Sequence, residues 1–279
     1  MTMNLIDVPN WDSFARTNAS DRFRKQSAAM GTPLTELLVG ETNLPPGARV
    51  LDIACGTGEP AISLATQLNG TGMVIATDIS TNPLEIAEQR GRQRALGNVR
   101  FQLADAHSLP FADENFDFAT CRLGLMFLID LPKALREIRR VLKPGGRFVT
   151  VNWGPIQQPY FETTIGTIVK QFPDLQFPNT GDMMFKFSVP GTLTRAFKAA
   201  GFSEAHDEIR DVAWTWHGTP QEVWEYFQAV TIPFSPLLNA VPSDKKQEVN
   251  EKVLQAISAY ADGDQVRFGA KFILATATR

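Results

Sequence analysis

The chain has 279 residues, of which 43% are hydrophobic and 20% charged, and its formal net charge is −3. This composition is typical of a soluble globular protein, and the slight acidity argues against nucleic acid as the main partner, because phosphate neutralisation needs a basic surplus. Two cysteines are too few for a disulfide framework or a multi-thiolate metal site, so we expect a cytoplasmic location and no metal. The sequence shows no signal-peptide pattern and no apolar run of membrane-spanning length, so we expect no membrane span.

The first half of the chain alternates short β-rich runs with helical patterns. The predicted strands are Arg49–Ile53, Met73–Asp78, Val99–Leu103, Phe116–Cys121 and Arg147–Val151. The predicted helices between them are Gly58–Leu68, Pro83–Leu96 and Leu131–Leu142. Strands that alternate with helices of this length predict a parallel sheet wound on both faces.

The second half follows a different pattern. Residues 155–190 contain five phenylalanines and the pair Met183 and Met184, without a clear strand. The remaining patterns predict helices at Leu193–Ala200, Pro220–Val230 and Ser243–Ala261 and strands at Glu204–Trp214 and Val266–Ala277. The last two strands are therefore separated by a helical insertion of roughly fifty residues, which is far longer than an ordinary loop.

The strongest local motif is the run VLDIACGTG at residues 50–58. It predicts a buried strand that enters a glycine-rich turn and then opens a helix. The glycines allow a ligand to approach the backbone closely, and a helix N-terminus attracts negative charge. By itself the motif also satisfies the loose dinucleotide pattern, and a tight turn without any ligand stays open as an alternative.

Later residues extend this motif. Asp78 ends the second predicted strand, twenty residues after Gly58, where a carboxylate can accept two hydrogen bonds from a ribose diol. Asp105 and Ala106 follow the third strand, and an aspartate there can accept a hydrogen bond from an adenine amino group. The run LREIRRVLKPGG then occupies residues 135–146.

With these motifs the sequence resembles the class I S-adenosylmethionine-dependent methyltransferases, above all their ubiquinone/menaquinone-biosynthesis-like branch. The resemblance rests on VLDIACGTG at 50–58, ATDIS at 76–80, LADAHSLPF at 103–111, FDFATCRLGLMFL at 116–128 and LREIRRVLKPGGRF at 135–148. It is dense over about residues 45–154, and its motifs are specific for fold and cofactor but not for substrate. It implies an α/β fold, a Rossmann-like doubly wound sheet of seven strands, six of them parallel, with the last strand antiparallel between the fifth and the sixth.

The resemblance and the change of pattern together predict four parts. Residues 1–44 form an N-terminal helical cap, 45–154 the cofactor-binding core, 155–190 a lid segment, and 191–279 the rest of the core with a helical insertion at 218–262. The segment Trp11–Met30 reads as a helix that closes over the cofactor in this family. The phenylalanines of the lid either line an apolar acceptor pocket or form a small core of their own.

The resemblance also implies which residues bind S-adenosylmethionine. Asp52 and the turn should hold the methionine end, Asp78 the ribose hydroxyls with Ile79 against the adenine, and Asp105 with the Ala106 N–H the adenine edge. The full set of implied cofactor residues is Asp52, Ala54, Gly56, Thr57, Gly58, Asp78, Ile79, Asp105, Ala106 and Cys121. Ala54 stands where many members of the family have glycine, which is a small change. His107 either lines the cofactor pocket or points to solvent.

Residues at the ends of later strands are candidates to bind the acceptor. Trp153 could stack on a substrate or pack as a rim residue, and Arg122 could lie near the sulfonium and anchor a substrate carboxylate or form a structural ion pair. Trp216 and His217 follow the sixth predicted strand, at the sheet edge where ligands bind in such folds. His217 could take a proton from the substrate, or it could be a loop histidine that caps the next helix.

We therefore predict an S-adenosylmethionine-dependent methyltransferase that methylates oxygen or carbon of a small apolar or aromatic acceptor. The alternative is a member of the same fold that uses its bound cofactor structurally and catalyses cyclisation. A nicotinamide-dependent dehydrogenase is disfavoured by Asp105, Ala106 and the run LKPGG at 142–146, which that fold has no reason to carry. The sequence determines neither the acceptor nor the oligomeric state.

Overall fold

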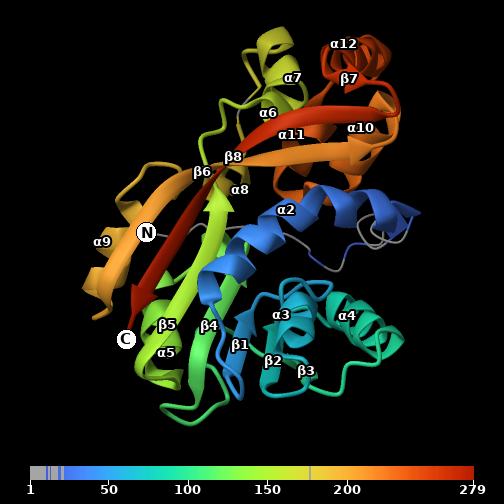
Figure 1. The fold of residues 1–279 in the computed structure, drawn as a ribbon. Coiled ribbons are helices and arrows are strands. Elements are labelled where there is room, and N and C mark those ends of the chain that lie inside the picture. The colour runs from blue at the N-terminus through green and yellow to red at the C-terminus, as the bar shows by residue number, and fades with distance from the viewer. Residues whose placement is uncertain (1–10, 12, 14–17, 20–21, 176) are drawn as a thin grey trace. The chain divides into compact units, whose positions relative to one another are not determined.

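The computed structural model describes residues 11, 13, 18–19, 22–175 and 177–279 (Figure 1). Its strands are β1 (Arg49–Ile53), β2 (Met73–Asp78), β3 (Val99–Leu103), β4 (Phe116–Arg122), β5 (Leu142–Trp153), β6 (Ser203–His217), β7 (Ala261–Asp262) and β8 (Gln265–Thr278). Its α-helices are α2 (Arg24–Thr42), α3 (Ala61–Leu68), α4 (Thr81–Gln93), α5 (Leu131–Val141), α6 (Pro159–Glu162), α7 (Ile165–Gln171), α8 (Asn179–Met184), α9 (Thr192–Ala199), α10 (Pro220–Val230), α11 (Ser235–Ala240) and α12 (Lys246–Ser258). Short 3-10 turns occupy Leu125–Phe127, Ile232–Phe234 and Ser243–Lys245.

The strands form one mixed sheet in the order β3-β2-β1-β4-β5-β8-β6. Strands β1 to β5 pair in parallel, whereas β8 pairs antiparallel with β5, from Arg147 opposite Thr278 to Trp153 opposite Phe272. The predicted Rossmann-like sheet and the place of its last strand are therefore confirmed. The seven strands of this order are the seven that were predicted, and the additional two-residue strand β7 pairs with the start of β8 outside that order.

Two strands differ from their predicted bounds by more than one residue at an end. Strand β5 begins at Leu142 instead of Arg147, and a shift of register against β4 accommodates the Lys143–Gly146 run. Strand β6 continues to His217, so Trp216 and His217 belong to the strand and do not follow it. Of the predicted helix at Trp11–Met30, Asn18, Ala19, Arg22 and the part of α2 from Arg24 onward are helical, and residues 12, 14–17 and 20–21 lie outside the described residues.

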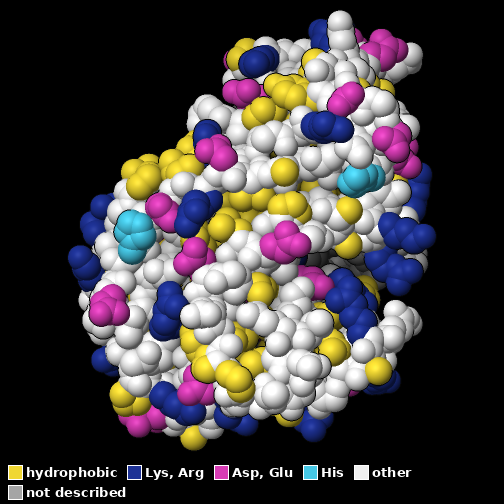
Figure 2. Space-filling view, viewed as in Figure 1, with side chains coloured by type: hydrophobic (Ala, Val, Ile, Leu, Met, Phe, Trp, Pro, Cys, Tyr) yellow, Lys and Arg dark blue, Asp and Glu magenta, His cyan; other side chains and the backbone are white. Residues whose placement is uncertain are grey.

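Contacts divide the chain into two compact units. Unit 1 contains the described residues up to Pro33, Pro155–Lys186 and Asp211–Lys271, and unit 2 contains Leu34–Gly154, Phe187–Arg210 and Phe272–Arg279. The predicted division into core, cap and lid is a functional one and stays a prediction. On the face shown in Figure 2, acidic and basic side chains both appear at many places, in agreement with the small net charge.

The core of unit 2 lies between the parallel strands and their helices. Val50, Val74 and Phe118 of the sheet pack in one buried cluster with apolar residues of α3 such as Leu64 and Leu68. Helix α5 follows the same principle, since its apolar residues recur every three or four positions and are buried. This packing holds the carboxyl ends of β1 to β4 at one edge of the sheet, where ligands of such folds bind.

The core of unit 1 is aromatic. Phe161 is only 1% exposed, and its ring lies 6.5 Å from Phe227 and 6.2 Å from Phe234. Tyr160 completes the cluster at 5.4 Å from Phe227. For Phe161, the interpretation that phenylalanines of residues 155–190 form a small core of their own is therefore confirmed. No helix within the described residues combines the length and the apolar character needed to cross a bilayer.

Candidate functional site

The carboxylate of Asp52 on β1 anchors the turn that follows this strand. This carboxylate is fully buried, and it accepts hydrogen bonds from Thr120 Oγ1 on β4 at 2.7 Å and from the Ala61 N–H of α3 at 3.2 Å. Burial raises the pKa of Asp52 to about 7, although the hydrogen bond from Thr120 and the charge of Arg122 act in the opposite direction. Asp52 thus connects β4 and α3 to the turn, and its carboxyl group titrates near neutral pH.

The two glycines of the turn, Gly56 and Gly58, have different surroundings. Gly58 has φ +109°, a backbone conformation that favours glycine, and a Cβ there would lie 2.7 Å from the Cδ1 of Ile62 and 3.2 Å from the Cβ of Ala87, so the Ile62 side chain would have to shift. Gly56 has φ +53°, and no heavy atom lies within 4 Å of a Cβ built on it. The space next to Gly56 is therefore open, as a ligand that approaches the backbone requires.

Ala54 also has positive φ, at +54°, where glycine is the easier residue. Its Cβ lies 2.5 Å from the position that a Cβ on Gly124 would take, and the Cys121 Sγ lies 3.0 Å from that position. The alanine is therefore accommodated because residue 124 is a glycine. This pairing explains how the chain tolerates its departure from the family pattern.

Two side chains that the sequence did not single out fasten the turn. Arg90 of α4 donates from Nη1 to the carbonyl oxygen of Thr57 at 2.5 Å, and the Thr57 Oγ1 lies 3.3 Å from the same nitrogen. Glu59 accepts from the N–H and hydroxyl of Ser63 and lies 3.5 Å from Arg90 Nη2. Arg122 donates from Nε to the Glu59 carbonyl oxygen at 3.3 Å. No local pattern could have found Arg90, because it lies 33 residues after Thr57.

Asp78 closes the turn from the end of β2. Its Oδ2 accepts a hydrogen bond from the Gly56 N–H at 2.8 Å, and its Oδ1 accepts one from the Ser80 N–H at 2.9 Å. A carboxylate has about four acceptor sites, so sites remain for two hydroxyl groups of a ligand. The next residue, Ile79, is 64% exposed, which is unusual for a large apolar side chain directly after a buried strand.

Asp105 is held by a histidine. Its Oδ1 accepts hydrogen bonds from the backbone N–H of His107 at 2.9 Å and from the ring Nδ1 at 2.6 Å, and His107 Nε2 accepts one from the Asp130 N–H at 3.2 Å. Burial raises the pKa of Asp105, but these hydrogen bonds outweigh it and hold the pKa below its ordinary value. Both bonds end on Oδ1, which leaves Oδ2 for a ligand. His107 therefore orients Asp105, and Ala106 between them is 8% exposed.

Two further candidates of unit 2 are packed inside it. Cys121 is fully buried, and burial raises the pKa of its thiol well above the ordinary range, so it is an uncharged packing residue. Trp153 is 6% exposed, and its ring is stacked on Phe272 with the centroids 4.5 Å apart. The roles of both residues beside a ligand stay predictions.

The remaining candidates lie in unit 1. Trp216 is fully buried, and its ring lies 5.5 Å from that of Phe23 and 4.9 Å from that of Tyr226, so packing accounts for it and gives an acceptor-binding role no support. His217 is exposed, and its Nδ1 lies 3.1 Å from Gln265 Nε2. Thr219 caps α10 in a capping box, so the alternative in which His217 caps that helix is wrong. The role of His217 as a base stays a prediction.

A family model decides the relationship of this chain to known proteins. The model of the ubiE/COQ5 methyltransferase family matches residues 37–188, which is more than half of the chain. The chain belongs to this family. The resemblance drawn from the five motifs is thereby confirmed, and this ubiE/COQ5 family member is an enzyme that uses S-adenosylmethionine as its methyl donor.

Individual relatives agree with this assignment. The demethylmenaquinone methyltransferase of Staphylococcus saprophyticus is 33% identical over 174 residues, which cover 58% of this chain and 73% of the relative. The enzyme of the same name from Lactiplantibacillus plantarum is 33% identical over 71% of this chain and 85% of its own length. Among solved structures, the [4+2]-cyclase SpnF is similar with a TM-score of 0.54 and 26% identity, over 91% of this chain and 82% of that protein.

Proposed function

We propose that this methyltransferase acts on a small acceptor with an apolar or aromatic ring, of the naphthoquinone type. The observation that carries the proposal is the similarity to two relatives that are demethylmenaquinone methyltransferases by name and are matched over 73% and 85% of their lengths. The reduced form of such a ring is electron-rich at carbon and carries hydroxyl groups, so both carbon and oxygen are nucleophiles. Which of the two accepts the methyl group is left to the experiment below.

The binding of the cofactor is proposed residue by residue. Asp78 would bind the ribose hydroxyls, with Ile79 against the adenine, and the Oδ2 of Asp105 would accept from the adenine amino group. The open space beside Gly56 and the remaining acceptor sites of Asp78 fit this ligand. When bound, S-adenosylmethionine supplies an electrophilic methyl group. The protein then has to orient the acceptor and exclude water, which needs little acid–base chemistry.

The test is turnover with a defined acceptor. The purified enzyme is given S-adenosylmethionine and a 2-alkyl-1,4-naphthoquinol kept reduced, and both S-adenosylhomocysteine and the methylated product are quantified. We expect equal amounts of the two, and NMR of the product identifies the methylated atom. Asp78→Ala should weaken binding of S-adenosylhomocysteine by about 1.5–3 kcal/mol in calorimetry, the range for hydrogen bonds to a charged group. Asp244→Ala, an exposed aspartate of unit 1, is the matched control.

The similarity to SpnF is the reason to test cyclisation as a second function. A cyclase that holds its cofactor structurally would form product without releasing S-adenosylhomocysteine. Product formation without that release would therefore contradict methyl transfer and support the alternative. A lack of turnover with quinols, but release of S-adenosylhomocysteine with another ring acceptor, would contradict only the proposed acceptor class.

Location and partners are proposed from composition. We infer a cytoplasmic enzyme from two cysteines that are both free thiols. A small-molecule acceptor without a nucleic-acid partner agrees with the net charge of −3.

A further inference from the structure

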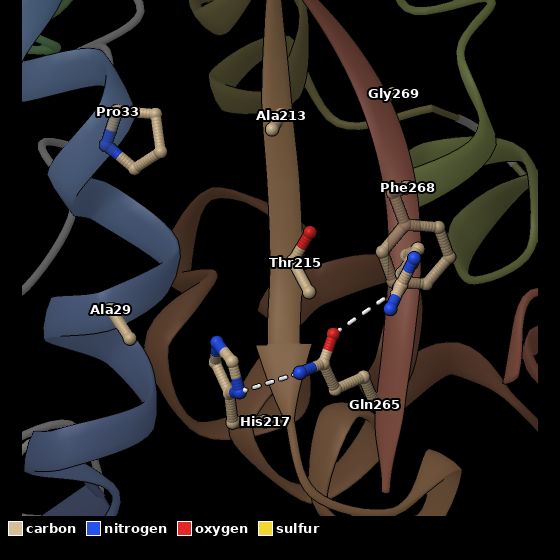
Figure 3. Close-up of a pocket in the computed structure, with 9 residues that line it drawn as sticks. Ala29, Pro33, Ala213, Thr215, His217, Gln265, Phe268 and Gly269 are labelled. Atoms are coloured by element: carbon tan, nitrogen blue, oxygen red, sulfur yellow. Dashed lines mark hydrogen bonds between the residues drawn. The ribbon is translucent and has the colours of Figure 1, made fainter. Parts of the chain in front are cut away.

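A hollow lies within unit 1. Its volume is about 540 Å³, within the size range of small-ligand pockets. Nine residues line it: Ala29, Pro33, Ala213, Thr215, His217, Gln265, Arg267, Phe268 and Gly269. Figure 3 shows that they come from α2 and from strands β6 and β8. The alternation of the strands puts Thr215 and His217 on the same face of β6, opposite to the buried Trp216.

The polar side of this hollow is a chain of hydrogen bonds. Arg267 donates from Nε to Gln265 Oε1 at 3.2 Å, and its Nη1 lies 3.2 Å from Asp262 Oδ2. The Nε2 of Gln265 lies 3.1 Å from Nδ1 of His217. Since a guanidinium only donates, the oxygen of the Gln265 amide has to face Arg267, and its NH₂ group then faces His217.

This chain determines the tautomer of His217. Its Nδ1 accepts from the Gln265 amide, so the neutral ring carries its proton on Nε2. In Figure 3 the second ring nitrogen of His217 is turned away from Gln265, toward the space between β6 and α2. His217 therefore presents an N–H donor to the hollow, whereas a general base would have to present a lone pair there.

The lining specifies the kind of ligand. The donors are His217 and the Thr215 hydroxyl, with the cation of Arg267 behind them, and the nine lining residues include no carboxylate. On the side of α2 the lining is apolar, with Ala29 and Pro33. This combination suits a ring that has an apolar face and carries an oxygen with partial or full negative charge.

We propose that this hollow binds a small ring compound with an acidic hydroxyl group, and that His217 holds the ring oxygen by donating a hydrogen bond from Nε2. His217 is then a binding residue. Gln265 and Arg267 are positioning residues, because they act through the tautomer of His217.

The binding test uses 2-hydroxy-1,4-naphthoquinone, whose acidic hydroxyl makes it an anion at neutral pH. Titration followed by calorimetry needs no cofactor and no turnover. His217→Ala should weaken binding about tenfold to a hundredfold, the loss expected for a hydrogen bond to a charged oxygen. His217→Gln should keep nearly the wild-type affinity, because an amide can donate but cannot act as a base. His206→Ala, an exposed histidine earlier on β6 in unit 2, is the matched control and should bind as the wild type does.

The tautomer is measured directly by ¹⁵N NMR of protein labelled at its three histidines. The His217 signals are those that His217→Gln removes. We expect a protonated Nε2 in the wild type and a mixture of tautomers in Gln265→Leu, which loses the amide. A protonated Nδ1 in the wild type would overturn the proposal, as would unchanged binding in His217→Ala or the same loss in His217→Gln.

The two proposals fail in different ways. If quinols are not methylated but ligand binding depends on His217 as described, the proposed acceptor is wrong and the hollow stands as a site for acidic ring hydroxyls. If quinols are methylated and the titration does not respond to His217, the function stands and the assignment of the hollow is wrong.

Discussion

The turn after β1 and the hollow in unit 1 hold their polar groups in opposite ways. In the turn, carboxylates accept mainly from backbone N–H groups, as Asp78 does from Gly56 and Ser80. In the hollow, side chains bond to side chains, as His217 does with Gln265. The first arrangement is part of the fold itself, whereas the second lies on an exposed strand face.

This difference has a physical consequence. A backbone amide occupies the same place whatever the side chain is, so a turn built from amides can hold an invariant ligand such as the cofactor. A chain of exposed side chains can change without unfolding the protein, so its ligand preference can change as well. Substitutions in the turn should therefore affect stability strongly, and substitutions in the hollow should affect binding alone.

The largest expected effect comes from Gly58, one of the two glycines of the turn. Gly58→Ala puts a Cβ 2.7 Å from Ile62 Cδ1 at φ +109°, and strain plus overpacking should cost about 2–5 kcal/mol of unfolding free energy in urea. Gly56→Ala should cost only about 1–2 kcal/mol of unfolding free energy, because no heavy atom lies within 4 Å of the added Cβ.

Calorimetry separates the two glycines further. Gly56→Ala should remain folded and lose affinity for S-adenosylhomocysteine about tenfold or more, since its Cβ enters the open space. Binding at the wild-type level in Gly56→Ala would mean that this space does not hold the cofactor.

The next largest effect is the pH dependence that Asp52 gives to the unfolding free energy of the protein without ligand. Its folded pKa of about 7 lies above the unfolded value of about 3.9. Between these values the unfolded chain is ionised at Asp52 while the folded protein stays protonated. Stability therefore falls as pH rises through this window and levels off above about pH 7, by up to about 4 kcal/mol. Urea unfolding at about pH 5 and pH 8 should show this fall in the wild type and not in Asp52→Asn.

Cofactor binding sharpens the same prediction. We predict that the cationic α-amino group of the cofactor favours ionised Asp52, so affinity for S-adenosylhomocysteine should rise with pH up to about 7. If the affinity for S-adenosylhomocysteine differs between wild type and Asp52→Asn by the same factor at every pH, a titration of Asp52 in this range is contradicted.

The smallest effects are expected from a matched pair of arginine substitutions, one in the turn and one in the hollow. Arg90 fastens the turn and its side chain is 17% exposed, so Arg90→Met should cost about 1–3 kcal/mol. Arg267 belongs to the hollow and is 60% exposed, so Arg267→Met should change stability by less than about 0.5 kcal/mol. Equal losses in the two thermal melts would remove the distinction between a site built into the fold and a site on its surface.

The sequence predicted most of the sheet because its determinants are local. Buried strands such as Arg49–Ile53 and Met73–Asp78 are short apolar runs between turn residues, and both bounds agree with the structure. The glycine-rich turn and Asp78 were also predictable, since one local motif and one fixed spacing carry them. The two-residue β7 was missed because two residues show no period.

Only the tertiary structure decided which side chains meet. Arg90 reaches Thr57 because α4 packs beside the turn, and Gln265 reaches His217 across a separation of 48 residues. Burial likewise decides that Asp52 titrates near neutral pH and that Trp216 is a core residue. Such contacts depend on how elements pack, and no spacing along the chain records them. The sequence by itself therefore determined the family, the cofactor and the frame of the sheet, whereas packing determined the proton on His217 and the hollow it faces.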